Sequence, residues 1–85
     1  MPQRRVAVAS AEGLHARPAA MFVKAAAESG EAVRIAKAES EVDARSILAV
    51  LSLDVRHGDE VLITTDTEPT LDALATLLTT TDPRP

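Results

Sequence analysis

The stretch Gly13-Leu14-His15-Ala16-Arg17-Pro18-Ala19-Ala20 combines residue types that can handle an anion. Pro18 suits the first turn of a helix, because its missing N–H is not needed there and its fixed φ is already helical. His15 therefore lies at a predicted helix N-terminus, where unpaired N–H groups and the helix dipole stabilise phosphate. The dipole also favours a neutral imidazole with a free lone pair, which is a nucleophile for a phosphoryl group. Arg17 adds a permanently charged donor group suited to phosphate oxygens.

Both residues also have a purely structural interpretation. His15 could be an exposed histidine in a turn, and Arg17 a solvated arginine on a helix surface, which is the commoner fate of an arginine. A short motif of this kind also arises by chance. Position alone does not separate the two interpretations.

A resemblance to a known family, carried by two stretches of the chain, separates the two interpretations. Gly13 to Ala20 resembles the active-site signature of the HPr family, the histidine-containing phosphocarriers of the bacterial phosphoenolpyruvate–sugar phosphotransferase system. Asp43-Ala44-Arg45-Ser46-Ile47-Leu48-Ala49-Val50-Leu51-Ser52-Leu53 resembles the family's second signature, around its regulatory serine. The length of 85 residues also fits, so the resemblance covers nearly the whole chain.

The resemblance implies a phosphoryl carrier without a cofactor, and not a turnover enzyme. His15 would accept a phosphoryl group on Nδ1 from phosphorylated Enzyme I and pass it to the IIA domain of a sugar permease, with Arg17 stabilising the phosphate. Ser46 suits the N-cap of a short helix. In many HPr proteins the matching serine is also phosphorylated by an HPr kinase/phosphorylase, which places negative charge beside the surface that binds partners.

The second signature is too apolar for one short helix to bury completely. Some of its side chains must be exposed, and an exposed apolar patch near an active site indicates docking. The resemblance assigns the surface that meets Enzyme I and the IIA domains to five residues: Ala16, Ala20, Lys24, Ile47 and Leu51.

Three features depart from the family pattern. Glu12 stands where small polar residues are common, and its carboxylate would repel a phosphorylated His15 or favour a protonated ring. Ala38-Glu39-Ser40-Glu41 replaces a turn that contains glycine, and Asp54 takes a place where glycine is frequent. The last two departures concern turns, and none removes a motif residue.

Hydrophobic periodicity predicts the elements that must position these residues. Strands are expected at Arg5 to Ala9, Ala32 to Lys37, around Val42 and at Glu60 to Thr65. Helices are expected from Ala16 to about Glu28, from Ile47 to Leu53, and after Asp66-Thr67-Glu68-Pro69. This βαββαβα order, with Val and Ile on one strand face, predicts a sheet with helices on one face and water on the other. That agrees with the α+β fold that the resemblance implies, an open-faced β-sandwich with three helices on one face of a four-stranded, mainly antiparallel sheet.

Composition narrows the remaining possibilities. The net charge of −4 and the single aromatic residue argue against nucleic-acid binding. The absence of cysteine fits a reducing compartment, and His57 has no ligand partner nearby, so no metal site is expected. No apolar run approaches the length that crosses a bilayer. We expect one HPr-like domain over residues 1–85, monomeric and cytoplasmic.

Three alternatives stay open. A related carrier could serve a nitrogen-related or dihydroxyacetone-kinase branch, although the sequence around Ser46 favours the sugar branch. A regulatory interaction module without phosphate is a second alternative, but members of that type lack the active-site histidine. A small hydrolase would need a second catalytic group near His15, and Glu12 alone offers itself.

Overall fold

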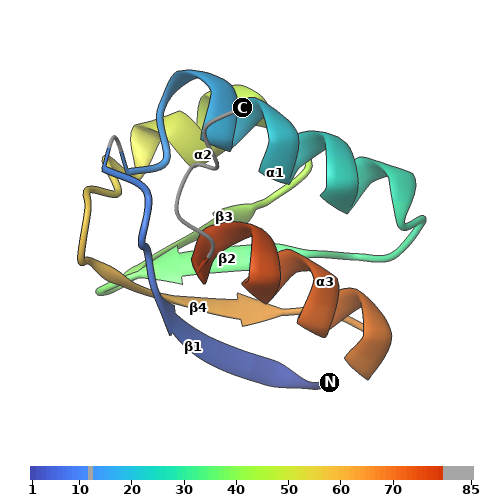
Figure 1. Ribbon diagram of the computed structural model, residues 1–85. Helices are drawn as coiled ribbons and strands as arrows, with labels where there is room; N and C mark the ends of the chain where they lie inside the picture. The colour runs from blue at the N-terminus through green and yellow to red at the C-terminus, as the bar shows by residue number, and fades with distance from the viewer. Residues whose placement is uncertain (12, 80–85) are drawn as a thin grey trace, which may run out of the picture.

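The computed structural model describes residues 1–11 and 13–79, except the side chain of Ala16. The elements follow the predicted βαββαβα order (Figure 1). Their bounds are β1 (Gln3–Ala7), α1 (Ala16–Glu28), β2 (Arg34–Lys37), β3 (Ser40–Asp43), α2 (Ile47–Ser52), β4 (Glu60–Thr64) and α3 (Glu68–Thr79).

The four strands form one sheet in the order β1-β4-β2-β3, and all neighbours are antiparallel. The three helices lie together on one face of this sheet (Figure 1). Val6, Ile35 and Ile63 point into the core, whereas Arg5 and Arg34 on the opposite face are exposed. The predicted open-faced α+β sandwich is therefore confirmed.

Strand ends differ from the prediction because backbone partners change there. The first strand was expected at Arg5 to Ala9, but β1 ends at Ala7. The Val8 N–H still reaches the Asp59 carbonyl at 2.9 Å in register with β4, but the Asp59 N–H turns back to the Arg56 carbonyl. The Ala9 N–H then donates to the Leu78 carbonyl of α3 at 2.9 Å, which takes the chain away from the sheet. β4 ends at Thr64, because its next in-register partner is Pro2: the Thr65 N–H donates to the Pro2 carbonyl, but proline has no N–H to return the bond.

The turn between β2 and β3 is shorter than predicted. Ser40 and Glu41 were expected in the turn, but they pair with Lys37 and Ala36 in the ladder. Only Ala38 and Glu39 connect the strands, and Ala38 has a positive φ of 54°. A two-residue hairpin of this kind favours left-handed residues, so alanine carries strain where glycine would not. The second strand also begins later than expected, at Arg34 instead of Ala32.

The helices follow the periodic pattern closely. α1 has the predicted bounds, with Ala19, Phe22 and Ala26 fully buried and Val23 partly buried. α2 ends at Ser52, one residue before the expected end, because Leu53 is its C-cap. For α3 the apolar spacing after Pro69 predicts a buried stripe, and the structure confirms it: Leu71, Leu74, Ala75 and Leu78. Fraying is expected at Asp82-Pro83-Arg84-Pro85, which lies outside the described residues.

Glu31 ties the start of α3 to the end of α1. Its carboxylate accepts hydrogen bonds from the hydroxyls of Thr65 (3.0 Å), Thr67 (2.9 Å) and Thr70 (2.6 Å), and from the Thr67 N–H (3.1 Å). The hydrogen bond from Thr70, followed by those from Thr67 and Thr65, lowers the pKa of the Glu31 carboxyl despite some desolvation. Charge-assisted hydrogen bonds are the strong ones, so this carboxylate stabilises the junction only while it is ionised.

Replacing Glu31 with glutamine is expected to lower the thermal unfolding midpoint at pH 7. The pKa of Glu31 is lowered on folding, so its contribution is complete above the ordinary value of 4.5 and is lost as the pH falls through the folded value. The gap between wild type and variant should therefore shrink below about pH 4.5. Melts followed by circular dichroism between pH 3 and 7 measure it, with Glu39→Gln in the exposed β2–β3 turn as control. A gap that is independent of pH would show that the carboxylate is not the stabilising group.

Within residues 1–11 and 13–79, no helix has both the length and the apolar character needed to span a membrane.

Candidate functional site

His15 is the N-cap residue of α1. Its backbone is extended, with φ −126° and ψ 160°, and its side chain makes no capping hydrogen bond. The N–H groups of Ala16 and Arg17 lie in the first turn, where a helix provides no internal acceptor. Since 45% of the His15 side chain is exposed, the imidazole is accessible beside these donors. The predicted placement of His15 at a helix N-terminus is confirmed.

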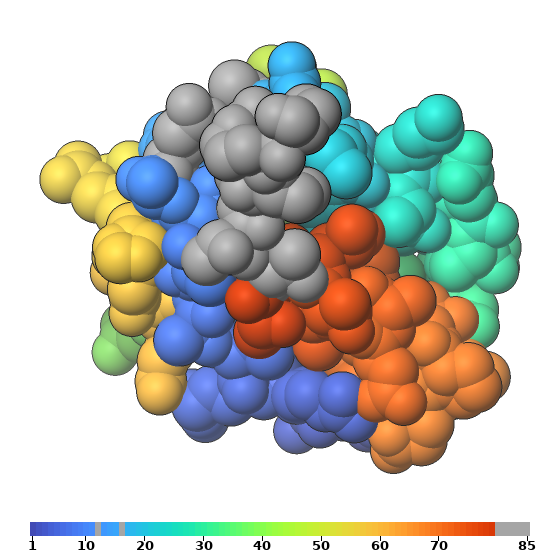
Figure 2. Space-filling model, viewed as in Figure 1, coloured from blue at the N-terminus to red at the C-terminus, as the bar shows by residue number. Residues whose placement is uncertain are grey.

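The segment before His15 is fixed by the loop that follows α2. The Leu14 N–H donates to the Val55 carbonyl at 2.9 Å, and the Leu14 side chain is fully buried. The Gly58 N–H donates to the Val8 carbonyl at 2.8 Å. In Figures 1 and 2 the blue segment before α1 lies against the yellow loop around residue 55. This loop therefore sets where His15 stands.

Asp54 in the same loop approaches His15, which the sequence analysis did not predict. Its Oδ1 lies 3.8 Å from the imidazole Nε2. The position was identified only as one where glycine is frequent, and a φ of 54° confirms that backbone interpretation. The sequence held no signal for this contact, because aspartate tolerates a left-handed backbone and so explains itself at a position where glycine is frequent.

Two cations hold the Asp54 corner. Arg56 donates to both carboxylate oxygens of Asp54, at 3.4 Å from Nε and 3.0 Å from a terminal nitrogen. Lys37 donates from Nζ to the Asp54 carbonyl at 2.6 Å and pairs with Asp59 at 2.9 Å. The Arg56 hydrogen bond and charge lower the pKa of Asp54, and the Lys37 hydrogen bond is the largest cause that lowers the pKa of Asp59. Both carboxylates are therefore ionised at neutral pH.

Arg17 is the second residue of α1 and is exposed, and its side chain forms no hydrogen bond or ion pair with another described residue. Its guanidinium is therefore available to an anion at the helix N-terminus. Glu12, the other charged residue expected near this site, lies outside the described residues. The role of Arg17 in stabilising a phosphate at His15 stays a prediction.

Ser46 is the N-cap of α2, as predicted. Its Oγ accepts a hydrogen bond from the Ala49 N–H at 3.3 Å, and the residue is exposed. The preceding Arg45 is paired with Asp43 through two side-chain contacts of 3.2 Å. The capping role is thus clear, and the hydroxyl is accessible.

Exposed apolar side chains lie on α1 and α2, which pack against each other. Leu48 is 76% exposed, Met21 50% and Ile47 37%. Of the residues predicted to bind partners, Ala20, Lys24 and Ile47 are exposed, whereas Leu51 is half-buried against the core. The Ala16 side chain lies outside the described part of the structure. The exposure of Leu48 was not predicted, because the short α2 has too few turns for periodicity to show which side faces the core.

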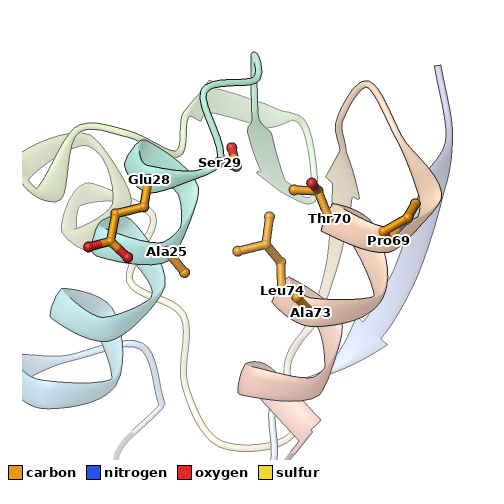
Figure 3. Close-up of a pocket in the computed structure, with 7 residues that line it drawn as sticks. All are labelled: Ala25, Glu28, Ser29, Pro69, Thr70, Ala73 and Leu74. Atoms are coloured by element: carbon orange, nitrogen blue, oxygen red, sulfur yellow. The ribbon is translucent and has the colours of Figure 1, made fainter.

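Other features contribute nothing to the His15 site. His57 is an exposed turn residue, as expected. A shallow groove between the C-terminal end of α1 and α3 is lined by Glu28, Ser29 and Thr70, among others (Figure 3), at the end of α1 opposite His15. The described residues contain no group of three or more His, Cys, Asp or Glu side chains suited to a metal ion.

Comparisons with known proteins agree with this geometry. Residues 2–81 match the family model described as the PTS HPr component phosphorylation site. The phosphocarrier protein HPr of Streptomyces coelicolor is 51% identical over 78 residues, which cover 91% of this chain and 84% of that protein. The HPr-like protein Crh of Bacillus subtilis is 39% identical over 77 residues, 91% of each chain. The crystal structure of HPr from Bacillus anthracis superposes with a TM-score of 0.86 at 38% identity, covering 91% of this chain and 95% of the other.

Proposed function

This chain belongs to the HPr family of phosphocarrier proteins of the phosphotransferase system, and we propose that His15 is the residue that carries the phosphoryl group. His15 takes it on Nδ1 from phosphorylated Enzyme I and passes it to IIA domains of sugar permeases. The supporting observation is the accessible His15 imidazole at the N-cap of α1, without a capping bond to occupy it. The protein is a relay and completes no turnover by itself.

The transfer needs positioning more than covalent catalysis. The Nδ1 lone pair attacks phosphorus, and an N–P bond forms as the bond to the donor nitrogen breaks and returns its electron pair to that nitrogen. The N–H groups of Ala16 and Arg17 and the Arg17 guanidinium stabilise the phosphoryl oxygens throughout. Because this binding is modest and open to solvent, the next acceptor can remove the group by the same step in reverse.

Intact-mass spectrometry tests this function. The wild-type protein, mixed with Enzyme I, phosphoenolpyruvate and Mg²⁺, should gain one phosphoryl group that is lost in acid. A protein that stays unmodified with a demonstrably active cognate Enzyme I would contradict the proposal. That result would favour the alternative of a regulatory interaction module.

Ser46 supports a regulatory extension of the same function. Its accessible hydroxyl at the start of α2 can accept a phosphoryl group from an HPr kinase/phosphorylase. A phosphate there would be negatively charged and would stand on the helix that also carries Ile47 and Leu48. Charge at this point would weaken docking of Enzyme I and IIA domains, so phosphorylation of Ser46 would slow the transfer to and from His15.

Leu48 tests whether the exposed apolar side chains of α2 take part in docking to Enzyme I. We expect Leu48→Glu to slow phosphoryl transfer from Enzyme I about tenfold or more through a raised KM, because an exposed apolar contact becomes a charge that docking must desolvate. Phosphorylation rates at several protein concentrations measure the effect. Ala73→Glu, an equal charge at an exposed position on α3, is the matched control. Equal rates for the two variants would place the docking surface elsewhere.

A further inference from the structure

We propose that Asp54 is a positioning residue for His15, whose carboxylate accepts the Nε2–H of the imidazole and so leaves Nδ1 as the nitrogen that carries phosphate. The inference deepens the proposed function and rests on it for the phosphorylated state. The geometry that carries it is also present without phosphate. Asp54 Oδ1 lies 3.8 Å from Nε2, so a small rotation of either exposed side chain closes a direct hydrogen bond.

The side chain and the main chain of Asp54 have separate partners. Arg56 binds both carboxylate oxygens, and Lys37 binds the Asp54 main-chain carbonyl while pairing with Asp59. The adjoining Val55 carbonyl accepts the Leu14 N–H, one residue before His15. The ring and the carboxylate therefore belong to one connected corner, in which Lys37 fixes the Asp54 main chain and Arg56 competes with His15 for the carboxylate.

The Asp54 side chain is an ionised carboxylate at neutral pH. The Arg56 hydrogen bond and charge, with smaller contributions from Lys37 and His15, lower the pKa of Asp54. Among the described residues, the charged side chains joined at this corner are Asp54 and Arg56 from the loop, Asp59 that follows it, and Lys37 from β2. The Asp54 carboxylate is the one anion in this set that approaches the ring, at Nε2.

A proton fixed on Nε2 serves both directions of transfer. In the unphosphorylated ring it leaves the Nδ1 lone pair free to attack phosphorus. In the phosphorylated ring, the Nδ1–P bond breaks and its electron pair returns to Nδ1, so a ring that keeps the Nε2 proton departs as neutral imidazole. Without that proton it would have to depart as the anion, a much poorer leaving group. Asp54 favours the protonated Nε2 and hence the transferable form.

The first arm of the test uses protein without phosphate. Nitrogen-15 NMR of the His15 ring above pH 8 reports which ring nitrogen carries the proton. We expect the Nε2–H fraction to fall in Asp54→Asn and Asp54→Gly, and to rise in Arg56→Gln, where the carboxylate loses its competing partner. Glycine also relieves the positive φ at position 54, so the two Asp54 variants should differ in stability while they agree in the ring readout.

The second arm follows phosphohistidine made with Enzyme I. At pH 8 to 9 its hydrolysis is expected to be about twofold to fivefold slower in both Asp54 variants, the range of one exposed ion pair, and faster in Arg56→Gln. In acid, where the solvent supplies the proton that the departing ring needs, the rates should converge. A purely structural effect of substitution would persist in acid and would run in the same direction for Asp54 and Arg56.

The two arms separate this inference from the proposed function. Unchanged ring protonation and unchanged hydrolysis in the Asp54 variants would overturn the role of Asp54 even if the wild type takes up phosphate. If no protein takes up phosphate but the ring protonation changes as expected, the contact between Asp54 and His15 stands and the carrier function fails.

Discussion

His15→Ala is expected to take up no phosphoryl group from Enzyme I under conditions that fully modify the wild type. The chain has two histidines, and only His15 stands at the N-terminus of a long helix with its imidazole accessible. Removing the ring removes the nucleophile, and none of the N–H groups that stabilise phosphate can replace it. The His15 side chain is half exposed, so its loss leaves the core intact. Intact-mass spectrometry should therefore show a folded protein at its unmodified mass.

His57→Ala provides the matched control. His57 lies in the exposed turn after Asp54 and has the same ring chemistry without a helix N-terminus. Full uptake of one phosphoryl group by this variant is expected. Uptake by His15→Ala, or its loss in His57→Ala, would show that the helix N-terminus does not select the acceptor.

The parts of the fold that short-range patterns encode were predictable from the sequence. The bounds of α1, the stripe of Leu71, Leu74 and Leu78 on α3, and the N-cap role of Ser46 each depend on residues within a turn or two of one another. Such patterns act through local geometry, so no knowledge of distant contacts is needed. The position of His15 at a helix start has the same origin.

Features that depend on contacts between distant segments were not predictable. The first strand ends early because Ala9 finds its partner in Leu78, at the far end of the described chain. The approach of Asp54 to His15 depends on contact between two segments that lie some forty positions apart in the sequence. The exposure of Leu48 depends on which side of α2 faces the core, and a six-residue helix has too few turns to show that by periodicity. Long-range closure, and not local propensity, decided each of these.

Gly13→Ala is expected to be the most damaging of the glycine-to-alanine substitutions at Gly13, Gly30 and Gly58. Gly13 has a φ of +67°, and a Cβ there would collide with the Val55 carbonyl oxygen and come within 2.7 Å of the Arg56 Cα. Both obstacles are backbone, so they cannot rotate away as a flexible side chain would. The left-handed conformation costs about 1–2 kcal/mol for a non-glycine residue and overpacking about 1–3 kcal/mol more. Denaturant unfolding should therefore show a loss of about 2–5 kcal/mol.

Gly30→Ala isolates the steric part of that loss. Gly30 has a similar φ of +73° after α1, but a Cβ there meets nothing within 4 Å, so this variant should lose only the backbone cost of about 1–2 kcal/mol. Equal losses in the two variants would show that the contact between Gly13 and the loop is not tight.

Because the same loop holds Leu14 through Val55 and contributes Asp54, relief of the clash in Gly13→Ala must move the support of His15. Gly13→Ala should therefore also slow phosphoryl uptake where it is still folded, whereas Gly30→Ala should not, since it lies beyond the opposite end of α1.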